Sequence, residues 1–213
     1  MAFIRFVTAA VLANAALSTP VPQSDDNPAQ YCDAATTICY SEWVSPENIA
    51  YRVAIPDTAV AGSFDVLLQI EAPTTVGWAG LAWGGVMVNN PLTIAWANED
   101  GVVVSSRSAT PYTGATYAVL PGSTANSTHW SITVLAQGLS SWGSTSLDPA
   151  GTISVAYAQS GTPPTEPANN ASRFSIHNSH AKWTLDLKAS QIANFAELVA
   201  NASAPLAGGV GNA

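Results

Sequence analysis

Side chains that could bind a metal ion or a haem are scarce in this chain of 213 residues. Apart from Met1 there is a single methionine, Met87, and the histidines are His129, His177 and His180. Thioether and imidazole groups suit copper and iron. A lone methionine more often fills a gap in a core, and His129, at the start of an expected strand, more often faces solvent. Any metal or haem site must draw on these side chains.

The two later histidines lie three positions apart, just past a proline-rich stretch at 163–167. In an extended segment, side chains at this spacing face opposite sides. We therefore expect one site to use either His177 or His180. Met87 follows Gly84 and Gly85, which let the backbone approach a flat group closely, and an Asn-Asn-Pro sequence ends the strand after it.

Residues 1–18 are typical of a secretory signal peptide, because a basic n-region precedes an apolar run and a segment of small residues. No other stretch approaches the roughly 20 apolar residues of a membrane-spanning helix. The glycosylation sequons at Asn126, Asn170 and Asn201 agree with export, and each is expected to mark the surface. The net charge of -8 argues against nucleic acid and anionic membranes as partners. We expect a secreted, extracellular monomer.

The two cysteines, Cys32 and Cys39, are predicted to form a disulfide, because export places them in an oxidising compartment. A thiolate zinc site would need further Cys or His at zinc spacing nearby, and the sequence has none there. A blue-copper site needs a Cys ligand, which the bridge would remove. The sequence also lacks the G-x-S-x-G, G-x-G-x-x-G and C-x-x-C-H patterns of serine hydrolases, dinucleotide-binding folds and covalent haem attachment.

Most of the chain from residue 31 to 187 alternates apolar and polar residues between turn clusters, as half-buried antiparallel strands do. About ten such strands predict an all-β fold, a two-sheet antiparallel β-sandwich of the immunoglobulin-like kind. Residues 159–173 are expected to form a long loop, because their prolines cannot lie in a central strand.

The end of the chain has the only helical period, and it predicts a short C-terminal helix. Ser190 is its expected N-cap, and Phe195, Leu198 and Val199 would share its apolar face. Residues 19–30 and 201–213 are expected to be a flexible lead and a disordered tail.

Five stretches together resemble the cytochrome domain of fungal cellobiose dehydrogenase, in the order that the family has them. They are residues 80–90, 94–98, 104–112, 126–130 and 174–177. The resemblance covers roughly residues 31–200 and implies a β-sandwich that holds haem b without a covalent bond. It also implies one Met and one His as axial ligands, which fall by direct match on Met87 and His177. His180 has no counterpart in the family's motif.

The resemblance implies further contacts with the cofactor. Tyr112 matches a family tyrosine that hydrogen-bonds a haem propionate. Arg107, from the same stretch, is expected to neutralise a propionate, with an ordinary strand-end arginine as the alternative. Trp83, from the stretch that carries Met87, is also expected to contact the cofactor.

With both axial positions filled, such a haem has no open position for oxygen or substrate, so electron transfer is the expected function. The resemblance implies a flavin-dependent sugar dehydrogenase as donor and a copper polysaccharide monooxygenase, ferric iron or a quinone as acceptor. The family's parent enzyme continues into a flavin domain that this sequence does not contain, so we expect no sugar oxidation by this chain alone.

Two rival functions follow from the same sequence. A carbohydrate-binding sandwich could use the seven tryptophans as a stacking platform. A surface protein with a non-functional pocket would have Met87 or His177 misplaced. The positions of these side chains discriminate among the three.

Overall fold

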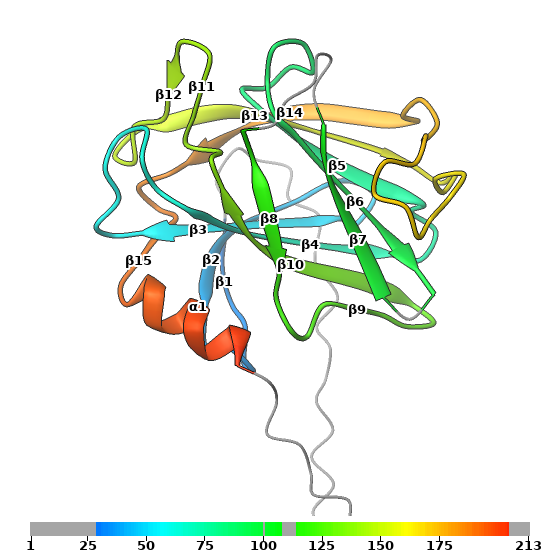
Figure 1. The fold of residues 1–213 in the computed structure, drawn as a ribbon, viewed down its shortest axis with the longest axis horizontal. Helices are drawn as coiled ribbons and strands as arrows, with labels where there is room; N and C mark the ends of the chain where they lie inside the picture. Colours follow the sequence, from blue (N-terminus) through cyan, green and yellow to red (C-terminus); the bar gives the residue numbers. More distant parts are fainter. Residues whose placement is uncertain (1–28, 100, 108–113, 205–213) are drawn as a thin grey trace, which may run out of the picture.

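The structure is a computed structural model that describes residues 29–99, 101–107 and 114–204. The described strands form two sheets packed face to face, followed by a short helix (Figure 1). The predicted all-β sandwich is therefore confirmed. The predicted signal peptide, residues 1–18, and the predicted propionate ligand Tyr112 lie outside the described residues.

The first sheet contains eight of the described strands. Its order is β1-β2-β3-β4-β10-β8, with β15 beside β3 and β9 beside β10. All of these pairs are antiparallel except the pair of β15 with β3. The strands are β1 (Ala29–Cys32), β2 (Cys39–Val44), β3 (Ala50–Pro56), β4 (Val66–Pro73), β8 (Thr116–Val119), β9 (Thr124–Ala125), β10 (His129–Gln137) and β15 (Gln191–Ile192).

The second sheet contains five strands in the order β14-β13-β5-β6-β7, all antiparallel. Its strands are β5 (Trp78–Trp83), β6 (Leu92–Asn98), β7 (Gly101–Arg107), β13 (Thr152–Ser160) and β14 (Ser179–Asp186). A separate small hairpin consists of β11 (Ser141–Trp142) and β12 (Thr145–Ser146). The described residues thus form fifteen strands rather than about ten. The excess comes largely from two-residue strands, which are too short to produce a visible alternation.

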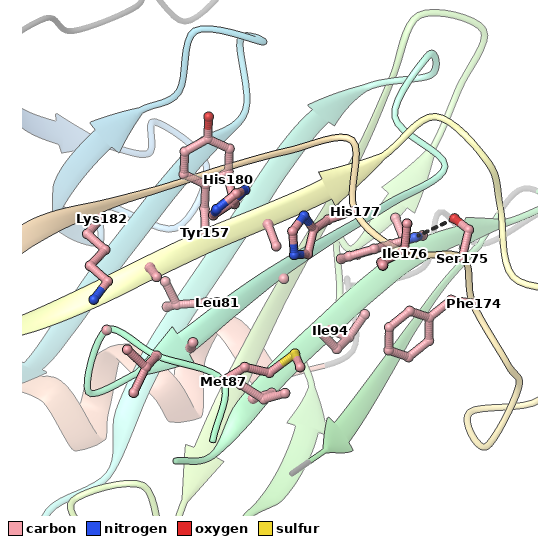
Figure 2. Close-up of a pocket in the computed structure, with 18 residues that line it drawn as sticks. Leu81, Met87, Ile94, Tyr157, Phe174, Ser175, Ile176, His177, His180 and Lys182 are labelled. Atoms are coloured by element: carbon pink, nitrogen blue, oxygen red, sulfur yellow. Dashed lines mark hydrogen bonds between the residues drawn. The ribbon is translucent and has the colours of Figure 1, made fainter. Parts of the chain in front are cut away.

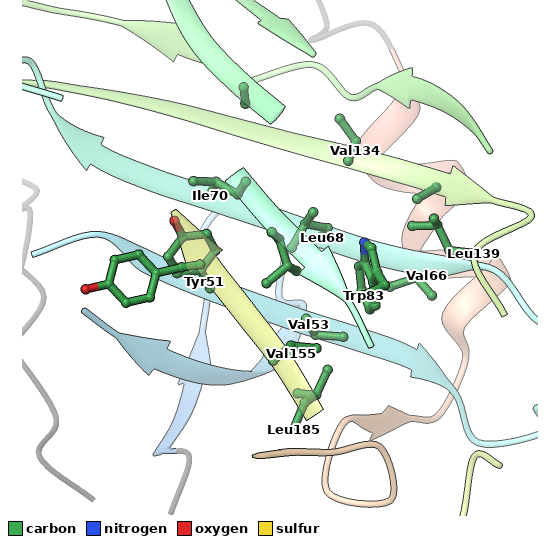
Figure 3. Close-up of a cluster of buried hydrophobic side chains, with 14 of the residues drawn as sticks. Tyr51, Val53, Val66, Leu68, Ile70, Trp83, Val134, Leu139, Val155 and Leu185 are labelled. Atoms are coloured by element: carbon green, nitrogen blue, oxygen red, sulfur yellow. The ribbon is translucent and has the colours of Figure 1, made fainter. Parts of the chain in front are cut away.

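The main core lies between the two sheets (Figure 3). Tyr51 and Val53 from β3 and Leu68 from β4 meet Trp83 from β5 and Val155 from β13 there. Tyr51 and Val53 lie at alternate positions of β3, as expected of a strand that turns one face to the core. The loop between β13 and β14 spans residues 161–178, close to the predicted loop at 159–173.

The outer face of the first sheet is covered by the C-terminal helix, α1 (Phe195–Ser203). Its residue Phe195 packs with Ala54, Leu67 and Ile38 in a second apolar cluster. This cover explains why β3 and β4 are buried on both faces, where the alternation predicted one polar face. None of the described helices is both long and apolar enough to cross a membrane.

The predicted start of this helix at Ser190 is wrong. The Ser190 hydroxyl donates to the carbonyl of Asp186 at 2.7 Å, and the next two residues join the first sheet as β15. The helix begins five residues later, at Phe195, after Asn194 in a left-handed conformation. It continues to Ser203, so the first three residues of the predicted disordered tail, 201–203, are helical. Backbone pairing with β3 therefore overrides the local helical signal at Gln191–Ile192.

The predicted disulfide is confirmed. Cys32 and Cys39 are bonded with an S–S distance of 2.05 Å and face each other across the β1–β2 pair. Asp33 organises the turn between them, because its carboxylate accepts hydrogen bonds from the backbone N–H groups of Ala35 and Thr36.

A buried ion network lies on the outer face of the first sheet, the face that α1 covers. Arg52 is only 2% exposed and donates to the carboxylates of Glu42 and Glu71, each at 2.6 Å. Burial favours the neutral form of the guanidinium, but the two carboxylates outweigh it and raise the pKa of Arg52. The ring of Tyr31 covers Arg52, with 3.5 Å between its centroid and the guanidinium carbon.

Candidate functional site

An open pocket of about 660 Å³ lies on the outer face of the second sheet. Its floor is built from small residues that alternate along two neighbouring strands, Gly80 and Ala82 on β5 with Ala156 and Ala158 on β13. A Cβ atom at Gly80 would lie 2.5 Å from the Cδ1 atom of Ile94, so a side chain here would require Ile94 to shift. Larger apolar side chains, such as that of Phe174, form the walls. The pocket is suited to a flat apolar group of cofactor size.

Met87 enters the pocket from the loop between β5 and β6 (Figure 2). Gly84 and Gly85 have positive φ angles, and a Cβ at Gly84 would collide with the side chain of Asn90. The Asn90 amide donates to the carbonyls of Val86 and Val88, on either side of Met87. The two glycines and Asn90 therefore fix the backbone that presents the thioether.

His177 enters from the long loop between β13 and β14, on the other side of the pocket from Met87 (Figure 2). The next residue, Asn178, ties the end of this loop to its start. Its backbone N–H donates to the Gln159 carbonyl at 2.7 Å, and its side-chain oxygen accepts from the Ser160 hydroxyl at 2.8 Å. Asn178 thus anchors the backbone next to His177, and the sequence analysis did not identify it.

The long loop is also held against the second sheet from its middle. The indole of Trp96 donates to the Pro167 carbonyl at 2.7 Å. One terminal nitrogen of Arg107 donates to the carbonyls of Asn170 and Ser172, both at 2.8 Å. Arg107 thus supports the loop that carries His177, while its Nε donates to the Ser105 hydroxyl on its own strand at 2.6 Å. This supporting role differs from the propionate contact expected from the sequence.

Both His177 and His180 line the pocket, with their ring centroids 4.5 Å apart. The expectation that they face opposite sides is wrong. His177 precedes β14, and the chain bends at Asn178, so the two residues are not part of one extended segment. Alternation along a strand does not apply across the bend.

The rim of the pocket exposes large apolar side chains. Met87 is 58% exposed and Ile176, next to His177, is 84% exposed. Exposed apolar groups around a concave site are characteristic of a surface that a ligand or partner covers.

Tyr157 lies on β13 between the floor residues Ala156 and Ala158, and its side chain is buried on the inner face of the sheet, where the phenol binds a carboxylate. The hydroxyl donates to Glu47 Oε2 at 3.0 Å and lies 3.1 Å from the Ser179 hydroxyl. Burial raises the pKa of Tyr157. Burial also acts to raise the pKa of Glu47, but hydrogen bonds from Ser179, Tyr157 and Ser45 outweigh it, and the pKa of Glu47 is lowered.

The model of the family described as the cytochrome domain of cellobiose dehydrogenase matches residues 31–197. The chain belongs to this family. Domains of this family bind haem b and transfer electrons, and the pocket described above has the size and apolar lining for such a group. Its donor set is also suitable, because thioether and imidazole are common axial ligands of haem iron.

Two solved structures share the fold of this cytochrome domain. The cytochrome b domain of pyranose dehydrogenase from Coprinopsis cinerea matches with a TM-score of 0.76 and 22% identity, over 83% of this chain and 96% of that one. The cytochrome domain of Myriococcum thermophilum cellobiose dehydrogenase matches with a TM-score of 0.72 and 23% identity, over 84% and 98%.

A curated relative is the pyrroloquinoline quinone-dependent pyranose dehydrogenase of Coprinopsis cinerea, which is 25% identical over 172 residues. The match covers 76% of this chain and 24% of the relative. The cytochrome domain thus spans about a quarter of the length of the curated relative that it matches.

Trp83 does not line the pocket of this cytochrome domain, in contrast to its expected contact with the cofactor. Its side chain is fully buried between the sheets, where the indole N–H donates to the Thr93 hydroxyl at 3.1 Å. Trp83 occupies the same alternate positions of β5 as Ala79 and Leu81 of the main core, whereas Gly80 and Ala82 form the pocket floor.

The tryptophans cannot form an exposed stacking platform, because all seven are at most 8% exposed. They are Trp43, Trp78, Trp83, Trp96, Trp130, Trp142 and Trp183. The feature that favoured a carbohydrate-binding module is therefore missing from the surface.

The remaining predicted residues lie away from the pocket. His129 begins β10 and lines a small polar pocket on the first sheet together with Asp33. Asn126, Asn170 and Asn201 are all exposed, as expected of surface positions. Glycosylation at these positions stays a prediction.

Proposed function

We propose that this chain is an extracellular electron-transfer cytochrome that holds haem b with Met87 and His177 as axial ligands. The observation that carries the proposal is the apolar pocket that Met87 and His177 enter from two separately anchored loops. That both side chains line one pocket argues against a surface protein with a non-functional pocket.

The residues of the pocket have distinct parts in this proposal. Haem b with two axial protein ligands supplies one-electron transfer and has no open position for substrate. The small residues Gly80, Ala82 and Ala156 let a flat group lie close to the sheet. Phe174 and Ile94 provide apolar contact and limit the access of water. The loop anchors at Asn90 and Asn178 hold the two ligands in place before binding, which reduces the entropy lost on binding.

We further propose that the electron donor is a sugar dehydrogenase. Membership of the cellobiose dehydrogenase cytochrome family and the similarity to a pyranose dehydrogenase support a donor with a flavin or quinone cofactor. The proposed electron acceptor is a copper polysaccharide monooxygenase, ferric iron or a quinone. The donor is tested by stopped-flow reduction with and without the flavin fragment of a cellobiose dehydrogenase. Reduction by cellobiose without the flavoprotein would contradict the proposal.

The ligand assignment is tested by replacing each pocket histidine in turn. His177→Ala should lose the low-spin haem spectrum, whereas His180→Ala should leave it nearly unchanged. His180 is a matched control, because its imidazole lines the same pocket 4.5 Å from that of His177. The opposite pattern would assign the ligand role to His180.

A further inference from the structure

Four buried aromatic rings form a continuous cluster in the core between the two sheets. Trp43 and Trp183 are stacked, with ring centroids 4.2 Å apart and 7° between their planes. Tyr157 lies 5.3 Å from Trp43, and Tyr51 lies 5.5 Å from Trp183. At such separations the edges of neighbouring rings are in contact, so electrons can exchange between them. Tyr157 alternates along β13 with Ala156 and Ala158 of the pocket floor, so its ring lies on the inner face of the second sheet, behind that floor.

The two tyrosines of this aromatic cluster differ in the partner of the phenol. Tyr157 donates to the carboxylate of Glu47 at 3.0 Å, whereas Tyr51 donates to the backbone carbonyl of Gly80 at 3.3 Å. A carboxylate at this distance can accept a proton, and an amide carbonyl cannot. Hydrogen bonds lower the pKa of Glu47 against the effect of burial, so it is ionised near neutral pH. Burial raises the pKa of Tyr51 well above its ordinary value, which opposes loss of its proton.

We propose that Tyr157 is a redox-active tyrosine to which the stacked tryptophans pass an electron hole, while Glu47 takes the phenolic proton. One electron leaves Tyr157, its proton moves to Glu47 Oε2, and an external one-electron oxidant such as a hydroxyl radical becomes hydroxide. Return of one electron and of the same proton restores the phenol. Transfer of the proton to Glu47 makes Tyr157 the end point of the relay, because the hole then rests on a neutral radical.

The route gives the protein a way to discharge oxidising radicals that react with its aromatic core. The electron that restores Tyr157 would come from the reduced cofactor, and this last step alone rests on the proposed function. The oxidation of Tyr157 depends only on the aromatic cluster and Glu47, so it can be tested on the chain with or without haem.

Flash oxidation of the full chain tests the proposal. Tris(bipyridine)ruthenium(II) with a cobalt(III) ammine as electron acceptor generates the oxidant at neutral pH, and electron paramagnetic resonance of frozen samples detects tyrosyl radical. Tyr157→Phe should lose most of the signal. Tyr51→Phe, which also removes one buried hydroxyl from the same aromatic cluster, should retain it. A wild-type signal in Tyr157→Phe, or equal losses in both variants, would overturn the proposal.

Glu47→Gln tests the proton acceptor separately, because an amide oxygen keeps the hydrogen bond but takes no proton. The radical yield should fall about tenfold, since a positioned base contributes at least this much to proton transfer. An unchanged yield would refute the role of Glu47. The haem spectrum of the same samples reports on Met87 and His177, so failure of the ligand assignment is seen independently of the radical yield.

Discussion

Both outer faces of the sandwich carry an arginine and apolar side chains, but these side chains have different roles on the two faces. On the first sheet, Arg52 is buried between two carboxylates, and helix α1 covers the neighbouring apolar residues. On the second sheet, Arg107 lies at a strand end and binds carbonyls of a loop, and the neighbouring apolar residues surround an open pocket. The covered face contributes to the stability of the fold. The open face keeps its apolar surface for a ligand.

The difference arises from the size of the residues that point outward from each sheet. Leu67 and Tyr40 on the first sheet are large enough to pack against Phe195 of the helix. On the second sheet the central outward positions are Gly80 and Ala156, which leave a hollow. An apolar sheet face that another element of the chain covers becomes part of the hydrophobic core. An apolar face without such a cover is available as a binding site.

The largest expected effect on stability is that of Arg52→Ala. Removal of the cation leaves two carboxylates close together in a region of low exposure, and we expect a loss of about 3 kcal/mol in the free energy of unfolding. Chemical denaturation measures it. The haem affinity of the folded variant should be unchanged, and a loss of haem with normal stability would break the division between the two faces.

Replacing both cysteines, Cys32→Ser with Cys39→Ser, should cost slightly less. Closing a loop with a sequence separation of seven removes chain entropy worth about 2.5 kcal/mol from the unfolded state. Denaturation midpoints of the wild type and the double variant give the difference. Titration of thiols in the unfolded, unreduced wild type should find none, and two reactive thiols per chain would refute the disulfide.

Arg107→Ala should change stability by less than about 1 kcal/mol, as expected for a position near the surface. It should nevertheless accelerate dissociation of haem about tenfold, because the loop that carries His177 loses two charge-assisted hydrogen bonds. Transfer of haem to apomyoglobin measures the dissociation rate. Arg173→Ala, in the same loop, is the control, and equal effects would remove the special role of Arg107.

The smallest effect expected is on the pH dependence of stability. Since the pKa of Glu47 is lowered in the folded state, its ionised form stabilises the fold above the unfolded pKa, near the ordinary value of 4.5. This contribution is lost as the pH falls through the folded pKa. Wild type should therefore lose more stability than Glu47→Gln on acidification below pH 4.5. Parallel curves for the two proteins would contradict the assignment.

The architecture could be predicted from the sequence because alternation directly reports which side of a strand is buried. The local pattern was wrong at Ser190, the expected helix N-cap, because the chain after it pairs with β3. It was also wrong at Leu67, because the C-terminal helix, distant in sequence, covers the face that alternation predicted to be polar. Both depend on contacts between residues far apart in the chain, which a local pattern does not contain.

The candidate site was predicted only in part, because some of its features also depend on contacts between residues far apart in the chain. Met87 and His177 followed from the family resemblance, and both line one pocket. Trp83 lies two positions after Leu81 on β5, and this spacing alone places both side chains on the inner face of the sheet. The bend at Asn178, which brings His180 to the same pocket, depends on hydrogen bonds across the ends of the long loop.

The central claim, that Met87 is an axial ligand, is tested most directly by the midpoint potential of Met87→His. A second imidazole donates more strongly than a thioether and favours ferric iron, so six-coordination should persist while the midpoint falls by on the order of a hundred millivolts. Spectroelectrochemical titration of wild type and variant provides the measurement. A fall of this size is the predicted result, and an unchanged midpoint would contradict the account, because it would mean that another residue binds the iron.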